Sequence, residues 1–254
     1  MEVNGKEMVF DEFGEGDVIL CVHGLGGTSN FWRPVVTALS ESYRVIAPDL
    51  PSSGRSDNDP SLSIASLAAD LLALMDGLEV QSFRLIGHSM GTIVCQHIAL
   101  AASDRVKDMV LLGPLAQPPE PARDALAQRA GVARDQGMTG IANTIADVAL
   151  SVETKRDNPN GQGFVREMLL RQSGEGYAQS CIALSEAQAA DAGALTMPVL
   201  LITGDQDGVA PPANVSLLDE ALPHSEFKLL EGCGHWTLTE KDQEVLELIR
   251  GFYG

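Results

Sequence analysis

The stretch that decides the fold is residues 83–102, which read FRLIGHSMGTIVCQHIALAA. Its opening residues have the pattern of a buried strand, and the apolar spacing from Thr92 onward is typical of a helix. Between them stands Gly87-His88-Ser89-Met90-Gly91, whose two glycines leave room for a sharp turn. Such a turn would hold Ser89 in a strained conformation with its hydroxyl above the end of the sheet. We therefore predict that Ser89 is a nucleophile; the alternative is that it merely caps the helix.

On both sides of this stretch, apolar runs that predict strands alternate with segments whose apolar residues are spaced as in a helix. The predicted strands cover residues 6–13, 18–22, 44–48, 83–87 and 106–112, and the predicted helices cover residues 31–39, 62–78 and 92–102. Strands that alternate with helices at this rhythm form a mainly parallel sheet with helices on both faces. The sequence therefore predicts an α/β fold.

The alternation stops after residue 114 and resumes near residue 198. Residues 115–191 are helical in pattern, with glycine and proline breaks and no convincing strand. After them the pattern predicts a strand, a helix, a strand and a last helix, over residues 198–203, 213–222, 226–230 and 240–252. We predict one domain in two sequence pieces, 1–114 and 192–254, with residues 115–191 inserted as a helical cap.

A serine hydroxyl is a weak nucleophile, so it needs a base within hydrogen-bond reach. Two loops that follow predicted strands offer partners: one holds Asp205 and Asp207, and the other holds His235. Because the carboxyl ends of parallel strands meet at one edge of a sheet, these loops would lie near Ser89. His235 is the predicted base, since the other histidines lack its place in the chain order or its position after a strand. Either aspartate could orient its ring.

A nucleophilic serine, a carboxylate and a histidine in this order, each after a strand, resemble the α/β-hydrolase superfamily. The resemblance covers residues 1–114 and 192–254. It implies an α/β-hydrolase fold, with a mainly parallel central sheet, helices on both faces and a helical cap. It also implies that Asp207 is the acid, because Asp207 stands past the glycine of its loop and shortly before Pro211. Asp205 would then order the turn.

Members of this family hold the negative oxygen of the tetrahedral intermediate with two backbone N–H groups, which form an oxyanion hole. One of them belongs to the residue after the nucleophile, here Met90. The resemblance places the other on Leu25, in the glycine-rich loop that begins at His23. The sequence departs from the family at Ser52, which stands where the pattern Asp-x-Pro-Gly has its glycine.

The serine at position 89 argues against the members of the family that dehalogenate haloalkanes or open epoxides with an aspartate nucleophile. The pattern is most similar to the group of 3-oxoadipate enol-lactonase and small bacterial carboxylesterases, which implies hydrolysis of a small-molecule ester or lactone. Hydrolytic carbon–carbon cleavage, perhydrolysis and a slow-turnover sensor of the same fold are the alternatives. Trp32 and Trp236 are candidates for the substrate pocket, and core positions suit them equally well. A cap arginine could receive a substrate carboxylate, but the sequence singles out none.

The formal net charge of −18 disfavours nucleic acid and anionic membranes as partners, because such a surface repels phosphate groups. The expected partner is a small-molecule substrate, and the oligomeric state stays open. The chain has no P-loop, dinucleotide fingerprint or cluster of metal ligands, so we expect no cofactor and no metal. Its 4 cysteines lie far apart and its first residues lack a signal-peptide pattern, which together favour a cytoplasmic location.

Overall fold

The computed structural model describes all 254 residues and confirms the predicted α/β fold. Its centre is a seven-stranded sheet in the order β3-β5-β4-β6-β7-β8-β9. Strand β3 runs antiparallel to β5, and every other pair of neighbours is parallel. The strands of this sheet are β3 (Phe10–Phe13), β4 (Asp17–Val22), β5 (Tyr43–Pro48), β6 (Phe83–His88), β7 (Val106–Leu112), β8 (Val199–Gly204) and β9 (Ser225–Leu230).

A small hairpin precedes this sheet. It consists of β1 (Glu2–Val3) and β2 (Lys6–Glu7), which pair with each other and with no other strand. The single strand predicted over residues 6–13 is therefore wrong, because its first half pairs with β1 while its second half, β3, pairs with β5.

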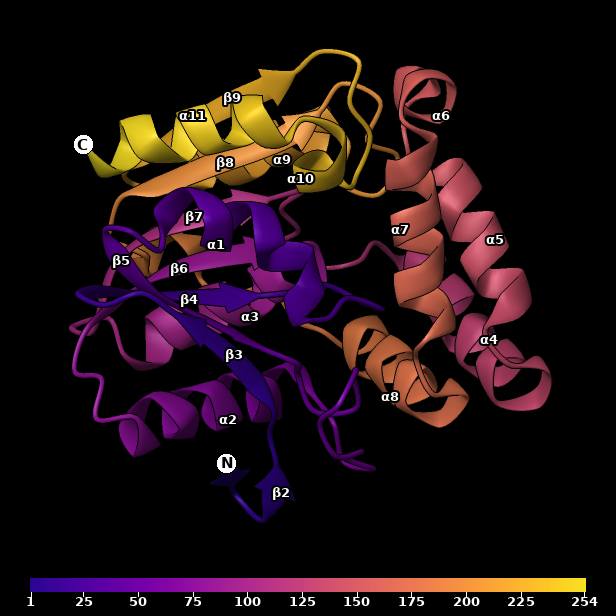
Figure 1. Cartoon of the computed structure of the whole chain (residues 1–254), viewed down its shortest axis with the longest axis horizontal. Helices are drawn as coiled ribbons and strands as arrows, with labels where there is room; N and C mark the ends of the chain where they lie inside the picture. Colours follow the sequence, from indigo (N-terminus) through magenta and orange to yellow (C-terminus); the bar gives the residue numbers. More distant parts are fainter.

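Helices cover both faces of the sheet (Figure 1). The helices α1 (Arg33–Leu39) and α11 (Asp242–Tyr253) contact each other over one face, and α2 (Ile64–Gly77) packs beside α3 (Met90–Ala101) over the other. The remaining elements of the core are α9 (Pro212–Ala221), the short α10 (Thr237–Glu240) and two 3₁₀ turns, η1 (Ser29–Trp32) and η2 (Ala192–Ala194). This double cover explains why the central strands read as continuous apolar runs: all residues of β8 are buried, and so are all but the first of β4.

Five helices occupy the sequence between β7 and β8. They are α4 (Glu120–Gln136), α5 (Thr139–Val148), α6 (Val152–Asp157), α7 (Pro159–Leu170) and α8 (Gly174–Ser185). Figure 1 shows them as a group to one side of the sheet, beyond the ends of its strands. Within the group, α4 packs against α8 and α5 against α7. None of the helices in the molecule has the length and apolar character that crossing a bilayer requires.

The inserted helices are tied to the core by hydrogen bonds from Gln172, which follows α7. Its side-chain amide donates to the carbonyl oxygens of Gly26 and Gly27, at 3.2 and 3.3 Å, and its Oε1 accepts from the N–H of Gly54 at 3.2 Å. A second contact involves Ser52, whose Oγ donates to Gln179 Oε1 at 2.6 Å. Two core loops are therefore held against the insertion, by bonds from Gln172 to their backbone and by the bond between the Ser52 and Gln179 side chains.

Ser52 itself adopts the conformation that a glycine would favour. Its φ of 66° lies in the left-handed region, where a side chain costs about 1–2 kcal/mol. Besides donating to Gln179, the Ser52 hydroxyl accepts from the N–H of Asp59 at 2.8 Å. The turn thus keeps the shape expected of a glycine, and two hydrogen bonds offset the strain.

The chain order of the strands creates a crevice between β4 and β6. From β4 the chain moves to β5 on one side and then returns to β6 on the other, so the connections after β4 and after β5 lie on opposite faces of the sheet. In open α/β sheets, such a switch point at the carboxyl ends of the strands is where ligands bind. The loop after β4 begins at His23 and the turn after β6 is Ser89, so both meet at this crevice.

Candidate active site

Ser89 stands alone between β6 and α3 in a strained backbone conformation. Its φ of 52° and ψ of −120° lie outside the regions that a residue with a side chain ordinarily adopts. The turn is possible because of the two glycines around it: a Cβ at Gly91 would lie 2.1 Å from the carbonyl oxygen of Val22, and one at Gly87 would lie 2.8 Å from Cys95 Sγ. The Ser89 hydroxyl forms no capping bond to the helix that follows.

His235 and Asp207 form a buried hydrogen-bonded pair. Nδ1 of His235 lies 2.8 Å from Oδ2 of Asp207, and the two residues are only 4% and 3% exposed. Asp207 comes from the loop after β8 and His235 from the loop after β9, so the parallel pairing of these strands brings the two loops together. Asp207 Oδ2 also accepts from Thr203 Oγ1 at 3.0 Å.

The surroundings of Asp207 keep its carboxyl group ionised. Burial opposes the charge, but His235 and the backbone N–H groups of Ala210 and Val209 outweigh it and lower the pKa of Asp207 to about 2. These N–H groups donate to Asp207 Oδ1 at 2.7 and 2.8 Å. An ionised carboxylate can only accept, so the proton of the shared hydrogen bond belongs to His235 Nδ1, and Nε2 is the ring nitrogen left for other partners.

Asp205 does not contact the imidazole. Its Oδ1 accepts from the backbone N–H of Cys233 at 3.1 Å, so it braces the loop that carries His235. The two aspartates of the loop after β8 therefore have different partners, and Asp207 is the one paired with the histidine.

Glu240 is a brace that the sequence patterns did not single out. Its carboxylate accepts from the backbone N–H groups of Gly234, Trp236 and Ser151 at 2.8 to 3.1 Å. It also accepts from Thr154 Oγ1 at 2.9 Å. This single side chain ties the histidine loop to the beginning of α6. Nothing in the sequence reveals such a role, because the donors come from segments more than eighty residues apart.

Removing the Glu240 carboxylate should therefore destabilise the molecule. Glu240→Ala leaves three backbone donors without a partner, and we expect the free energy of unfolding to fall by about 2–4 kcal/mol. Glu247→Ala is the matched control, because Glu247 is exposed in α11 and forms no ion pair. Urea denaturation of both variants measures the difference. Equal stability of the two variants would contradict the bracing role.

The loop after β4 approaches Ser89 very closely. A Cβ on Gly24 would lie 2.7 Å from Ser89 Cβ and 2.9 Å from the carbonyl oxygen of His88, so only glycine fits there. His23 holds the loop in place from within: its Nδ1–H donates to the Gly24 carbonyl at 2.8 Å, and its Nε2 accepts from the N–H of Leu50 at 2.9 Å. Burial lowers the pKa of His23, so it stays neutral and serves as a brace.

The two predicted oxyanion donors have free backbone N–H groups. The N–H of Leu25 forms no hydrogen bond within the protein. The N–H of Met90 lies in the first turn of α3, where no helical carbonyl is available to it. Leu25 and Ser89 also line the same cavity.

This cavity has a volume of about 310 Å³ and lies between the core and the inserted helices. Ser89, His235 and Trp236 line it. Trp32 does not: its side chain is fully buried in the core, where it packs edge-on against Phe31 at 4.9 Å between ring centroids. The structure therefore gives Trp32 the core position, one of the two that the sequence left open, because η1 turns this residue inward.

His88 is a second histidine at the cavity, and it is not a base. Burial, reinforced by nearby His235, lowers the pKa of His88 to about 3. Its Nε2–H donates to the carbonyl oxygen of His235 at 3.0 Å, and this bond stabilises the backbone of the loop that carries His235. Gly113 supports the same region, because a Cβ there would lie 2.9 Å from His235 Nδ1. Sequence patterns could not identify Gly113, since the clash involves a loop over 120 residues away.

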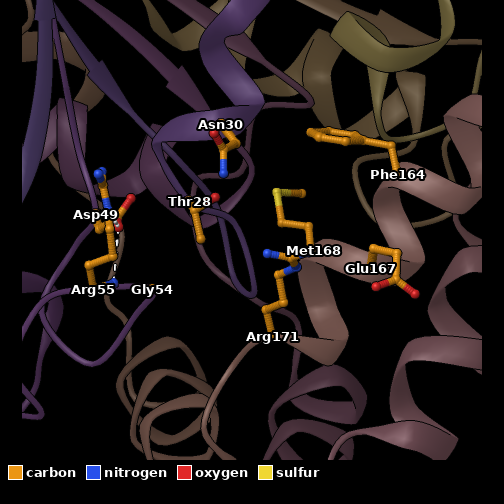
Figure 2. A pocket seen from close by; sticks show the side chains of 9 residues that line it. All are labelled: Thr28, Asn30, Asp49, Gly54, Arg55, Phe164, Glu167, Met168 and Arg171. Atoms are coloured by element: carbon orange, nitrogen blue, oxygen red, sulfur yellow. Dashed lines mark hydrogen bonds and ion pairs between the residues drawn. The ribbon is translucent and has the colours of Figure 1, made fainter.

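A second cavity, of about 540 Å³, lies between the core loops and α7 (Figure 2). Thr28 and Asn30 from the core stand on one side, and Met168 and Arg171 from the insertion stand on the other. It shares no lining residue with the first cavity and contains neither Ser89 nor His235. The reactive groups are therefore gathered in the smaller cavity.

Comparison with known proteins agrees with this architecture. A family model described as the alpha/beta hydrolase fold matches residues 17–242. The 3-oxoadipate enol-lactonase 2 of Acinetobacter baylyi is 30% identical over 235 residues, which cover 91% of this chain and 87% of that protein.

Two solved structures are similar over nearly the whole chain. A thermophilic esterase from Thermogutta terrifontis has a TM-score of 0.93 at 28% identity and covers 98% of this chain and 93% of its own. The enol-lactonase from Burkholderia xenovorans LB400 has a TM-score of 0.93 at 27% identity, with coverage of 99% and 98%. The chain therefore belongs to the α/β-hydrolase family and is a hydrolase with esterases and lactonases among its relatives.

Proposed function

We propose that this protein is a serine hydrolase that cleaves a carboxylic ester or lactone of a small molecule through an acyl-enzyme on Ser89. The observation that carries the proposal is the hydrogen bond between His235 and Asp207. The histidine of this pair lines the same cavity as Ser89. The enol-lactonase and esterase relatives support the same class of reaction.

The first half of the proposed reaction forms the acyl-enzyme. His235 Nε2 takes the proton of the Ser89 hydroxyl while Oγ attacks the carbonyl carbon of the substrate. The carbonyl oxygen becomes negative, and the N–H groups of Leu25 and Met90 donate to it. When the intermediate collapses, the bond from carbon to the leaving oxygen breaks and His235 protonates that oxygen.

The second half hydrolyses the acyl-enzyme. His235 takes a proton from water as its oxygen attacks the acyl carbon, and the proton then returns to Ser89 Oγ. An ester yields a carboxylic acid and an alcohol, and a lactone yields one hydroxy acid. We propose that residues 115–191 act as a cap in this reaction, because their side chains, among them Leu126 and Leu184, form much of the cavity wall.

A substrate panel tests the proposed function. Purified protein and Ser89→Ala are compared on p-nitrophenyl acetate and butyrate, dihydrocoumarin as a lactone, and a dienoic diketone acid for carbon–carbon cleavage. We expect turnover of an ester or the lactone by the wild type only. Faster cleavage of the diketone would favour carbon–carbon hydrolysis instead, and no turnover above the Ser89→Ala background on any substrate would favour a sensor.

Replacing Gly24 by alanine should disable the proposed oxyanion loop. The added Cβ would collide with Ser89 and push Leu25 away from it, so we expect kcat/KM on the best ester to fall by about 10²- to 10³-fold, as when one oxyanion donor is lost. Gly131→Ala is the matched control, because a Cβ there meets nothing within 4 Å and α4 should gain up to about 1 kcal/mol of stability. Steady-state kinetics would overturn the prediction if both variants kept the wild-type kcat/KM.

A further inference from the structure

The cavity that holds Ser89 is mostly apolar but has one permanently charged wall residue. Twelve of its 21 lining residues are hydrophobic, and no aspartate, glutamate or lysine is among them. The exception is Arg129, on the face of α4 that turns toward the cavity. A guanidinium in such a wall keeps its charge, so the cavity carries a local positive potential within a molecule of net charge −18.

Arg129 has no anionic partner within the protein. Four other arginines of the insertion pair with an acidic side chain: Arg123 with Glu120, Arg134 with Glu175, Arg156 with Asp157, and Arg166 with Glu167. Arg129 has no ion pair, although the chain carries 35 acidic residues, and the Tyr177 hydroxyl lies close to it. Arg129 is also only partly exposed to solvent. A half-buried guanidinium without a carboxylate is costly unless a ligand supplies one.

Tyr177 on α8 adds a second unused donor to the same wall. Its side chain is 1% exposed and lines the cavity, and its hydroxyl has no hydrogen-bond partner. Burial raises the pKa of Tyr177, so the hydroxyl keeps its proton, and Arg129 lies near enough to oppose that rise. Because α4 packs against α8 and Arg129 is close enough to affect the Tyr177 hydroxyl, the two side chains are neighbours in the cavity wall. Buried hydroxyl groups normally find a partner, so this one points to an absent acceptor.

We propose that Arg129 and Tyr177 bind a carboxylate of the substrate. The inference rests on the proposed function: the substrate then carries an ester or lactone, placed at Ser89, and also a carboxylate, placed at Arg129 and Tyr177. A carboxylate is the ligand that fits both donors, since it accepts two N–H bonds from a guanidinium and a further bond from a hydroxyl. The apolar side chains that form most of the cavity wall, Leu126 among them, suit an aliphatic chain. Hydrolysis of an ester of this kind yields a dicarboxylate and an alcohol.

Monoesters of dicarboxylic acids test this assignment. The substrates are the monomethyl esters of straight-chain acids from succinic to pimelic acid, and the dimethyl ester of each acid is its neutral counterpart. Proton release in a pH-stat gives kcat and KM. The variants are Arg129→Met and Tyr177→Phe. Arg171→Met is the matched control, because Arg171 is the other cap arginine without an ion pair and lines the second cavity instead.

We expect the wild type to prefer the best monoester over its dimethyl ester by about 10- to 100-fold in kcat/KM, the usual effect of charge-assisted hydrogen bonds. Arg129→Met should abolish this preference, chiefly by raising KM for the monoester, and should lower kcat/KM for the dimethyl ester much less. Tyr177→Phe should reduce the preference by about 3- to 10-fold, as for one lost hydrogen bond. Arg171→Met should retain it.

Other results separate the two proposals. Equal kcat/KM of the wild type on monoester and dimethyl ester would overturn the inference but leave the proposed hydrolase function standing. An Arg129→Met variant that loses activity on both esters equally would have the same consequence. If the wild type cleaves neither these esters nor any substrate of the p-nitrophenyl ester and lactone panel above the Ser89→Ala background, the proposed function fails. Calorimetry with the free dicarboxylates then decides the inference alone: binding that Arg129→Met abolishes supports it, and equal binding by both proteins overturns it.

Discussion

Ser89→Ala is expected to lower kcat on the best ester by about 10⁵-fold, the largest effect of any single replacement in this chain. Without the hydroxyl no acyl-enzyme forms, and only binding and the oxyanion donors can still assist a direct attack by water. The fold should persist, because the Ser89 side chain forms no hydrogen bond that the structure requires. Alanine meets about the same backbone strain as serine at a φ of 52°.

Two measurements on Ser89→Ala check this expectation together. Steady-state kinetics gives the loss of kcat, and thermal unfolding followed by circular dichroism shows whether the variant is folded. A folded variant that keeps more than about one hundredth of the wild-type kcat would contradict a covalent role for Ser89.

Asp207→Asn is expected to lower kcat by about 10³- to 10⁴-fold without removing any reacting atom. An asparagine can turn its NH₂ group toward His235 Nδ1, and that nitrogen must then accept instead of donate. The proton moves to Nε2, which can no longer take the proton of Ser89. Because the pKa of Asp207 is about 2, its carboxylate is ionised throughout the neutral range, so the wild type has the intact carboxylate–imidazole pair over that whole range.

Asp205→Asn is the matched control for this replacement. Asp205 lies two residues away in the same loop, but it bonds to the backbone of Cys233 and not to the imidazole. We expect its kcat to stay within about tenfold of the wild type, since the amide oxygen can accept the same hydrogen bond. If Asp205→Asn lost more activity than Asp207→Asn in steady-state assays, the assignment of the acid would be reversed.

The sequence predicted those features that depend on local pattern and chain order. Buried strands read as apolar runs, and the turn at Ser89 is specified by the two glycines beside it. The loops of Asp207 and His235 could be placed together because parallel strands end at one edge of the sheet. The insertion was recognised from the point where the alternation stopped.

The remaining features depend on contacts between segments that are distant in the sequence. Trp32 and Trp236 have the same amphipathic character and are both buried, and only the packing of the loops decides that Trp236 lines the cavity while Trp32 does not. Glu240 looks like any charge near a helix, yet it satisfies donors in two other loops. Arg129 was one of several cap arginines of equal standing. The other cap arginines, except Arg171, have acidic partners, whereas Arg129 has none. This difference depends on tertiary contacts, so the spacing of residues in the sequence could not reveal it.

The most direct test of the central claim is covalent labelling of Ser89. A fluorophosphonate reacts with a serine only where a neighbouring base and oxyanion donors activate the hydroxyl. We predict that mass spectrometry of the labelled and digested wild type places the phosphonyl group on Ser89, and that Ser89→Ala and His235→Ala stay unlabelled. Labelling at another residue, or an unlabelled wild type, would contradict the claim that Ser89 is an activated nucleophile.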